Sequence, residues 1–321
     1  LVGGTSTGAI VATSISLGLP LARVKTFYVE RAAQFFKKRR WLSRFAQRAA
    51  FDIDALEREV TEVIGDVKLG DDAFKTYLAI VTKRLDTGSA WILSNLPQAP
   101  YFEDPEDGSY HGNRHYTVAR LLAASAAAPT YFDQRYIQIA PDQIGVFVDG
   151  GLSPYNDPSL ALLKIARLSA FGLQWPANDR DLFILSIGTG RYRPRLDQKT
   201  AMRLAPIPLA YHAMRGMVTD AEVQTLTMMQ WLGTSKQATP INSEIGALED
   251  DHLTVQPAFS FLKLDLPLEQ ADLVSLGIDV PSAELERYYN FDDPEIIEPI
   301  YELAQRYIEA ALDFDELLKE S

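Results

Sequence analysis

The residues near the start of the chain could carry nucleophilic chemistry. Gly4-Thr5-Ser6-Thr7-Gly8 matches the pattern G-x-S-x-G, whose spacing suits a serine on a sharp turn between a strand and a helix. Glycine lacks a Cβ, so Gly4 and Gly8 leave room for the backbone to turn tightly. Ser6 would then lie at a helix N-terminus, where backbone amides favour a developing negative charge. The pattern predicts a serine nucleophile, with Gly4, Thr7 and Gly8 supporting the turn.

Other interpretations of this stretch are less specific or fail on spacing. A cluster of Gly, Ser and Thr is also typical of an ordinary loop or helix cap. A phosphate-binding loop requires a lysine directly after its last glycine, and no lysine follows Gly8. A dinucleotide fingerprint requires G-x-G-x-x-G, and residues 3–8 lack the middle spacing. A serine nucleophile is the better candidate, and it needs a base elsewhere in the chain.

Asp149 is the candidate base. It follows the apolar run Gly145-Val146-Phe147-Val148 and precedes Gly150 and Gly151. Reactive groups of open α/β sheets gather beyond the carboxyl ends of the strands, so we expect Ser6 and Asp149 at the same sheet edge. A partly desolvated carboxylate there could take the serine proton directly. The alternative interpretation is a simple Asp-Gly turn.

Composition excludes several classes of function. The chain has 321 residues, a net charge of −12 and no cysteine. The negative charge argues against a general nucleic-acid binder, and the lack of cysteine removes disulfides, thiolate metal sites and a cysteine nucleophile. The four histidines, His111, His115, His212 and His252, show no metal-binding spacing. No apolar run reaches the roughly 18 residues that a membrane-spanning helix needs.

One stretch reverses the overall charge. Residues 32–51 contain no acidic side chain, and Trp41 and Phe45 lie among six basic residues: Lys37, Lys38, Arg39, Arg40, Arg44 and Arg48. A basic helix with aromatic residues can lie on an anionic lipid surface. The alternative is a solvated helix whose aromatic side chains face the core. A methionine stripe in residues 206–233 is likewise typical of core packing, or could line an acyl groove.

The remaining pattern predicts the elements that hold these groups. Residues 77–82 and 90–93 are rich in β-forming side chains, and Asp86-Thr87-Gly88-Ser89 between them predicts a hairpin. Residues 182–187 form an apolar run typical of a buried parallel strand. Strands separated by helices indicate an α/β fold with a mostly parallel central sheet and helices on both faces. We expect one domain over residues 1–321, with a helical segment from 281 to 321 packed on it.

These segments together resemble the patatin-like phospholipase family. Residues 3–10 resemble its nucleophile motif, residues 124–132 its S-A-A-P-T-Y-F segment, Val148-Asp149-Gly150-Gly151 its D-G-G/A motif, and residues 185–190 its L-S-[LI]-G-T-G strand. The resemblance implies a patatin-like three-layer α/β fold and a Ser-Asp dyad, with Ser6 as nucleophile and Asp149 as base. It also implies hydrolysis of acyl esters of glycerolipids or phospholipids, without metal or cofactor. We expect a cytoplasmic or membrane-peripheral location.

One family feature is missing from this sequence. Members carry an oxyanion loop of the type D-G-G-G-x-[RK]-G a few dozen residues before the nucleophile, and five residues precede Ser6 here. Loss of a single oxyanion donor typically slows catalysis ~10²–10³-fold. We therefore expect a truncated form of an active enzyme, in which the Thr7 amide contributes to the oxyanion site.

The sequence is also compatible with two other functions. An α/β-hydrolase with a Ser-Asp-His triad is compatible with the chain order Ser6, Asp149, then His212 or His252. That fold usually places several strands before the nucleophile, which argues against it. A non-catalytic lipid-binding protein on the same fold is the second rival. The presence of both Ser6 and Asp149 argues against it, whereas the missing oxyanion loop favours it.

Overall fold

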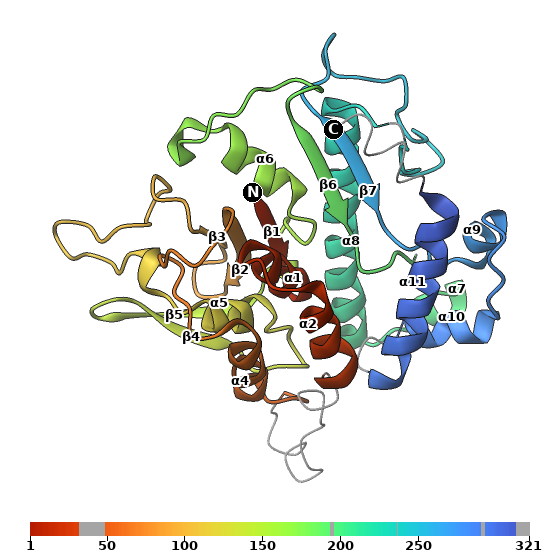
Figure 1. The fold of residues 1–321 in the computed structure, drawn as a ribbon. Coiled ribbons are helices and arrows are strands. Elements are labelled where there is room, and N and C mark those ends of the chain that lie inside the picture. Colours follow the sequence, from red (N-terminus) through yellow and green to blue (C-terminus); the bar gives the residue numbers. More distant parts are fainter. Residues whose placement is uncertain (32–48, 193–195, 236, 290–292, 313–321) are drawn as a thin grey trace. The chain divides into compact units, whose positions relative to one another are not determined.

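The structure is a computed structural model that describes residues 1–31, 49–192, 196–235, 237–289 and 293–312 (Figure 1). The predicted basic stretch, Lys37, Lys38, Arg39, Arg40, Arg44 and Arg48, lies outside these ranges. The chain divides into two compact units, residues 1–177 with 218–229, and residues 178–217 with 230–321. The expected single domain stays a prediction, and each unit is described by itself.

The first unit is built around a five-stranded sheet. Its strands are β1 (Val2–Thr5), β2 (Leu78–Arg84), β3 (Ala90–Ser94), β4 (Arg135–Ala140) and β5 (Gln143–Asp149). Its helices are α1 (Thr7–Ser16), α2 (Leu21–Thr26), α4 (Ile53–Ile64), α5 (Val118–Ser125) and α6 (Ser159–Arg167). Short turns of helix complete it: η1 (Phe27–Arg31), η3 (Asn113–His115), η4 (Gly150–Leu152) and η5 (Ser169–Phe171).

Strand β2 organises this sheet, because three other strands pair with it. β3 pairs with residues 79–83 of β2 in the antiparallel direction and so takes one of its edges. β1 pairs in parallel with residues 78–81, and β5 pairs antiparallel with residues 82–84. The β2 residues that pair with β1 and with β5 overlap the β2 residues that pair with β3. Because β3 occupies one edge of β2 there, β1 and β5 must both lie on its other edge. They lie end to end along it, which brings the carboxyl ends of both strands together.

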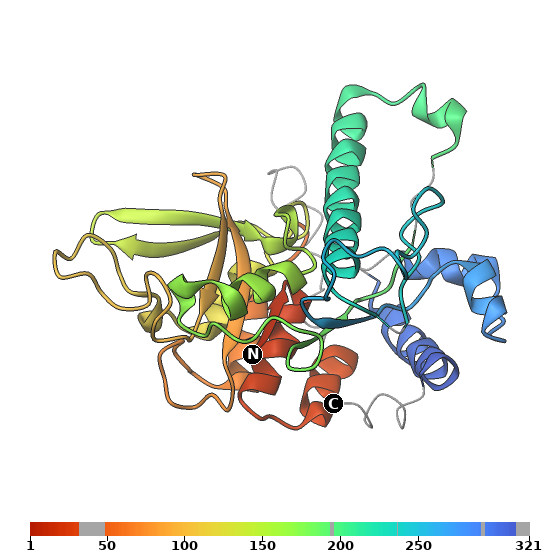
Figure 2. The ribbon, with the colours of Figure 1, turned by 90° about the horizontal axis from the view of Figure 1, so that it is seen from above.

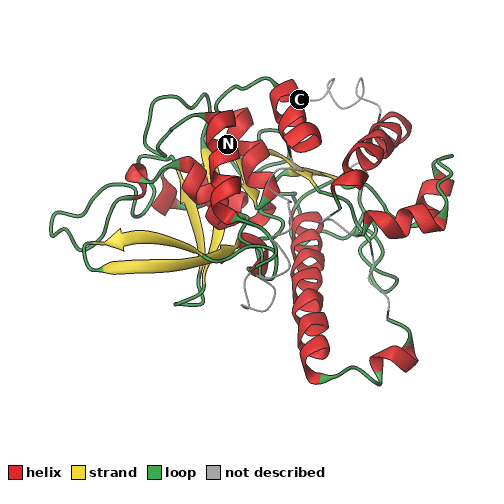
Figure 3. Ribbon diagram, turned by 90° about the horizontal axis from the view of Figure 1, so that it is seen from below, coloured by secondary structure: helices red, strands yellow, loops and turns green. Residues whose placement is uncertain are grey.

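The expectation of a mostly parallel central sheet is wrong. In the described part of this sheet β1 and β2 run parallel, whereas the β2–β3, β2–β5 and β4–β5 pairs are antiparallel. Short connections explain two of the antiparallel pairs, since a parallel pair needs a crossover of a dozen or more residues. The predicted turn at residues 86–89 joins β2 to β3, and Pro141-Asp142 joins β4 to β5. The strands are yellow in Figure 3.

Helices pack on both faces of the sheet, as a three-layer α/β fold requires. Ala79 of β2 lies in a cluster with Leu162 and Ile165 of α6. Successive residues of a strand point to opposite faces, so the fully buried Leu78 and Ile80 face the other side. Helices α1 and α5 contact β2 and each other, and they cover that side.

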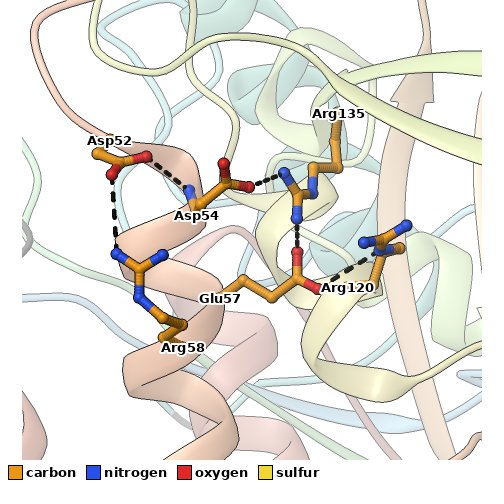
Figure 4. Close-up of polar contacts among 6 residues, drawn as sticks. All are labelled: Asp52, Asp54, Glu57, Arg58, Arg120 and Arg135. Atoms are coloured by element: carbon orange, nitrogen blue, oxygen red, sulfur yellow. Dashed lines mark hydrogen bonds and ion pairs between the residues drawn. The ribbon is translucent and has the colours of Figure 1, made fainter.

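Ion pairs join α4 to helix α5 and to strand β4 (Figure 4). Arg135 at the start of β4 forms ion pairs with Asp54 and Glu57 of α4, and Arg120 of α5 reaches the same Glu57. Asp52 caps α4: its carboxylate accepts a hydrogen bond from the Asp54 amide at 3.0 Å. The network holds α4 against both a helix and a strand.

The second unit contains a separate two-stranded parallel sheet. Its strands are β6 (Phe183–Ile187) and β7 (Ser260–Leu264), and its helices are α7 (Gln198–Ala201), α9 (Gln270–Ser275), α10 (Ser282–Tyr288) and α11 (Ile297–Ala311), with a helical turn η6 (Pro294–Ile296). The long helix α8 (Pro206–Leu232) begins in this unit. Leu273, Leu285 and Leu303 of α9, α10 and α11 share one buried cluster. The C-terminal helices therefore pack on one another around an apolar core.

The parallel direction of β6 is confirmed, but its burial is one-sided. Ile184 and Ser186 are buried, while Phe183, Leu185 and Ile187 on the alternate face are exposed among the described residues. No helix in the described ranges has both the length and the apolar character needed to cross a bilayer.

Candidate active site

Ser6 occupies a strained turn between β1 and α1. Its backbone has φ 55° and ψ −126°, a positive-φ conformation that non-glycine residues rarely adopt. A Cβ on Gly4 would lie 2.2 Å from backbone atoms of Gly8, so a glycine is required at position 4. A Cβ on Gly8 would meet nothing within 4 Å. The sequence pattern therefore identified the turn correctly, but packing requires only the first of its two glycines.

The Ser6 hydroxyl donates a hydrogen bond to a buried carboxylate. Ser6 Oγ lies 2.8 Å from Asp149 Oδ2, and the Gly151 amide donates to Asp149 Oδ1 at 2.7 Å. Asp149 is 6% exposed, whereas Ser6 is half-buried and Thr7 is exposed, so solvent reaches the hydroxyl side of the pair. A nucleophile and an acceptor at this distance meet the geometric requirement for general-base activation.

Burial raises the pKa of Asp149 from 3.8 to about 6, and the hydrogen bonds from the Gly151 amide and the Ser6 hydroxyl oppose this rise. The carboxylate loses water that would stabilise its charge, which favours the protonated form. At neutral pH Asp149 is still ionised, but it is a stronger base than an exposed aspartate. A base with a pKa near the working pH transfers protons efficiently.

The two strands that carry these residues meet at the middle of β2. Thr5, the last residue of β1, is opposite Val81, and Asp149, the last residue of β5, is opposite Thr82. A Cβ on Gly150 would lie 2.4 Å from the Val81 carbonyl oxygen and 2.9 Å from Thr5 Cγ2, which shows how tightly the strand ends approach. Ser6 and Asp149 are brought together as expected, but by antiparallel β5 rather than by parallel strands.

Ser125 fixes the backbone of the nucleophile. Its side chain is fully buried, accepts a hydrogen bond from the Ser6 amide at 2.8 Å and donates one to the Val81 carbonyl at 2.6 Å. In the sequence Ser125 belongs to the segment that resembles the family's S-A-A-P-T-Y-F motif, which by itself indicates no role for it. The available signal was a lone hydroxyl at the end of an alanine-rich helix, where a buried polar group needs partners.

Asn156 lies close to the Gly151 backbone that bonds the base, and it connects to Glu222. Asn156 donates a hydrogen bond to Glu222 of α8, within the first unit. A Cβ on Gly151 would lie 2.6 Å from Asn156 Oδ1 and 3.0 Å from Asp149 Oδ1. Gly151 thus allows its amide to reach the carboxylate in a crowded space. Sequence reasoning missed Asn156 and Glu222, since no local pattern connects positions so far apart.

The amides next to Ser6 differ in availability. The Ser6 amide is already bonded to Ser125, whereas Thr7 is the first residue of α1, and amides in a first helical turn have no acceptor within the helix. The Thr7 carbonyl accepts a hydrogen bond from the Tyr28 hydroxyl at 2.9 Å, which ties the start of α1 to η1. The Thr7 amide is therefore one donor of the turn for a negative charge forming beside Ser6.

The histidines of the rival triad belong to other parts of the chain. His212 lies in the first half of α8 and His252 in the segment before β7, both in the second unit. In the described residues the Ser6 hydroxyl donates directly to Asp149, so the position that a triad gives to histidine is held by the carboxylate. In the same ranges no group of three or more His, Asp or Glu side chains could hold a metal ion.

A serine on a strained strand-to-helix turn, bonded to a buried carboxylate in a three-layer fold, places the chain among α/β proteins with a nucleophile elbow. Comparison with known families narrows the class. The family model described as patatin-like phospholipase matches residues 1–163, which is half of the chain. The chain belongs to the patatin-like phospholipase family.

Characterised relatives are similar over part of their length. A cGAMP-activated phospholipase of Vibrio cholerae serotype O1 is 26% identical over 198 residues, which cover 59% of this chain and 52% of the relative. One of Pseudomonas aeruginosa is 28% identical over 193 residues, 59% of this chain and 51% of the relative. A cUMP-AMP-activated phospholipase of Escherichia coli is 26% identical over 233 residues, which cover 72% of this chain and 65% of the relative. The matches thus span about half to two thirds of these relatives.

Proposed function

We propose that this chain carries the catalytic machinery of a lipid acyl hydrolase that cleaves fatty acyl esters of glycerolipids or phospholipids. The observation that carries the proposal is the 2.8 Å hydrogen bond from Ser6 Oγ to Asp149 Oδ2. Membership of the patatin-like phospholipase family supports the substrate class. The phospholipase names of the relatives support it as well.

The reaction follows from the positions of these atoms. Ser6 Oγ attacks the ester carbonyl carbon while its proton passes to Asp149 Oδ2, and the carbonyl oxygen becomes an oxyanion. The Thr7 amide and the N-terminus of α1 stabilise that charge. The C–O bond to the alcohol then breaks, and the alcohol leaves with the proton from Asp149. Water, deprotonated by Asp149, attacks the acyl-Ser6 ester. The bond to Ser6 Oγ then breaks, the fatty acid leaves, and Ser6 Oγ takes the proton back from Asp149.

A covalent probe tests the proposal most directly. A fluorophosphonate should label Ser6, as located by peptide mass spectrometry, and Ser6→Ala and Asp149→Asn should both abolish labelling. The exposed Ser275→Ala serves as the matched control and should label normally. The double variant should be no worse than either single one in ester hydrolysis, because the two residues act as a unit. Labelling that survives Asp149→Asn but is lost in His212→Ala or His252→Ala would favour the triad instead.

The names of the relatives also suggest how such an activity is controlled. We propose that a cyclic dinucleotide regulates this chain, supported by the cGAMP-activated and cUMP-AMP-activated relatives. Phospholipid hydrolysis should rise when cGAMP or cUMP-AMP is added and should not respond to the separate mononucleotides. An unchanged rate with both cyclic dinucleotides would contradict this regulation.

Membrane contact through the basic stretch at residues 37–48 is a further part of the proposal. Six positive charges without an acidic neighbour suit an anionic lipid surface, where each contributes ~1 kcal/mol. A phospholipid substrate would bring the protein to such a surface.

A further inference from the structure

Among the described residues, the end of α7 and the first half of α8 expose several large apolar side chains. Met202, Ile207 and Met217 are 80%, 84% and 71% exposed, and Leu209 is exposed as well. We define the α8 arm as residues 198–217, which comprise α7, its connection to α8 and the first turns of α8 (Figure 2). A large exposed apolar patch on a folded protein marks an interaction site. The methionine stripe of residues 206–233 is thus divided: Met229 is core, as expected, while Met217 is exposed.

The charge of the arm suits a negatively charged partner. Residues 198–219 contain no Asp or Glu, although the whole chain has a net charge of −12. Lys199 and Arg203 are exposed next to Met202 and precede the apolar turn at Ile207. Cationic side chains beside exposed aliphatic ones are the combination that lets a helix lie in the interface of an anionic membrane.

Removing water from the N-terminus of α8 also costs little free energy. The first amides of a helix have no acceptor within it, and burying such a donor away from water is costly. Pro206 and Pro208 have no amide proton, so two of these unpaired donors do not exist in α8. The amide that follows Pro208, that of Leu209, already donates to the Ala205 carbonyl at 2.9 Å, so of the four residues 206–209 only Ile207 still brings an amide to be satisfied. Ile207 can therefore enter an apolar layer with few unsatisfied groups beside it.

We infer that the α8 arm inserts into the surface of an anionic lipid bilayer. Ile207, Leu209 and Met217 enter the boundary between headgroups and acyl chains, and Lys199 and Arg203 pair with lipid phosphates. This inference rests on the proposed function, which places the substrate in a bilayer, and it adds the surface by which the protein reaches that substrate. It is independent of the basic stretch at residues 37–48.

Because the chain has no cysteine, one introduced thiol can report on the arm alone. Ile207→Cys, labelled with the environment-sensitive fluorophore NBD, should show a blue-shifted and several-fold brighter emission with vesicles of phosphatidylcholine and phosphatidylglycerol. Val255→Cys, labelled in the same way at another fully exposed position, should not change. Equal responses at both positions, or none at position 207, would overturn the inference. A response at 207 that grows with protein concentration without vesicles would overturn it in favour of a second copy of the chain.

The charges give a second measurement. Lys199→Gln with Arg203→Gln should lower partition into these vesicles about 30-fold at low salt, since two basic residues contribute ~1 kcal/mol each. Arg306→Gln on α11, another exposed basic residue, should have no effect, and an equal loss in that control would overturn the inference. Turnover of a soluble short-chain ester should be unchanged in every variant. Insertion of the α8 arm without any ester turnover would refute the proposed function and leave the membrane inference standing. Ester turnover without insertion would refute the membrane inference and leave the proposed function standing.

Discussion

The Oγ atom of Ser125 accepts a hydrogen bond from the backbone amide of Ser6 at 2.8 Å, and its own proton goes to the Val81 carbonyl at 2.6 Å. One buried hydroxyl therefore links the nucleophile turn, the end of α5 and the middle of β2. Ser6 has a positive φ, a conformation that costs on the order of 1–3 kcal/mol unless its surroundings enforce it. Ser125 supplies part of that enforcement.

Ser125→Ala should lower kcat about tenfold or more with little change in KM. The variant leaves the Ser6 amide and the Val81 carbonyl without their partner, and a lost buried hydrogen bond costs ~1–3 kcal/mol. Ser14→Ala is the matched control, because Ser14 is equally buried but bonds within α1 to the Ile10 carbonyl. It leaves no buried group without a partner, because the Ile10 carbonyl lies within α1, so it should keep its kcat. Equal kcat losses in both variants would contradict a positioning role for Ser125.

Activity should depend on the ionisation of Asp149. The pKa of this carboxyl is raised to about 6 by burial, and only its charged form can accept the Ser6 proton. We expect kcat/KM for a soluble ester to increase about tenfold per pH unit below that value and to level off above it. A profile whose inflection is lost in His212→Ala or His252→Ala would point to a histidine base.

The same carboxyl should destabilise the fold at neutral pH. Its pKa is higher in the folded chain, about 6, than the ordinary 3.8, so the folded state binds the proton more tightly. The resulting stabilisation is fully present below pH 3.8 and is lost as the pH rises through 6, a difference of roughly 3 kcal/mol. Asp149→Asn should therefore raise the free energy of unfolding by up to that amount at neutral pH. Urea titrations of variant and parent should show this gain in unfolding free energy at neutral pH and its disappearance near pH 4. A gain of equal size near pH 4 would contradict an origin in the Asp149 charge.

The sequence was informative where chemistry depends on neighbouring residues. The G-x-S-x-G spacing and the Asp-Gly-Gly run predicted Ser6 and Asp149 at one sheet edge, where the structure places them in hydrogen-bond contact. The turn residues 86–89 predicted the β2–β3 hairpin, which the structure contains. The direction of β5 was not visible, because its pairing with β2 joins segments some sixty residues apart and the apolar run 146–148 suits either direction. Contacts between distant segments also determine the roles of Ser125, Asn156 and Glu222. Sequence spacing alone could therefore not assign those roles.

Burial was the other property that local pattern could not decide. Met217 and Met229 lie on one helix in similar sequence surroundings, yet Met217 is 71% exposed and Met229 is fully buried. Helical spacing places side chains on a face but does not say what covers that face.

The basic stretch should strengthen binding to anionic lipid if its membrane role is correct. Replacing Lys37, Lys38, Arg39 and Arg40 by Gln removes four charges worth ~1 kcal/mol each at an anionic surface, so vesicle co-sedimentation should fall strongly. The difference should be largest at low salt, where screening is least. Turnover of a soluble ester should hardly change. Equal sedimentation of variant and parent at low and high salt would assign the stretch to a solvated helix instead.

The two glycines of the nucleophile turn should respond differently to the same substitution. In Gly4→Ala the new Cβ would lie 2.2 Å from the backbone carbon and oxygen of Gly8, and backbone atoms cannot move aside as a flexible side chain can. We expect a loss of about 3 kcal/mol or more in the free energy of unfolding, with loss of activity. Gly8→Ala meets no atom within 4 Å and lies in the first turn of α1, so stability should be kept or rise by up to ~1 kcal/mol.

Denaturant titration of both glycine variants measures this contrast, and fluorophosphonate labelling of Ser6 reports whether the turn is intact. Gly8→Ala should fold and label. Open space borders Gly8, two residues after Ser6. If an ester approaches Ser6 through that space, Gly8→Leu should slow phospholipid hydrolysis more than Gly8→Ala while folding equally well. Similar destabilisation by Gly4→Ala and Gly8→Ala would contradict the packing at the turn, and full activity of Gly8→Leu would place the substrate elsewhere.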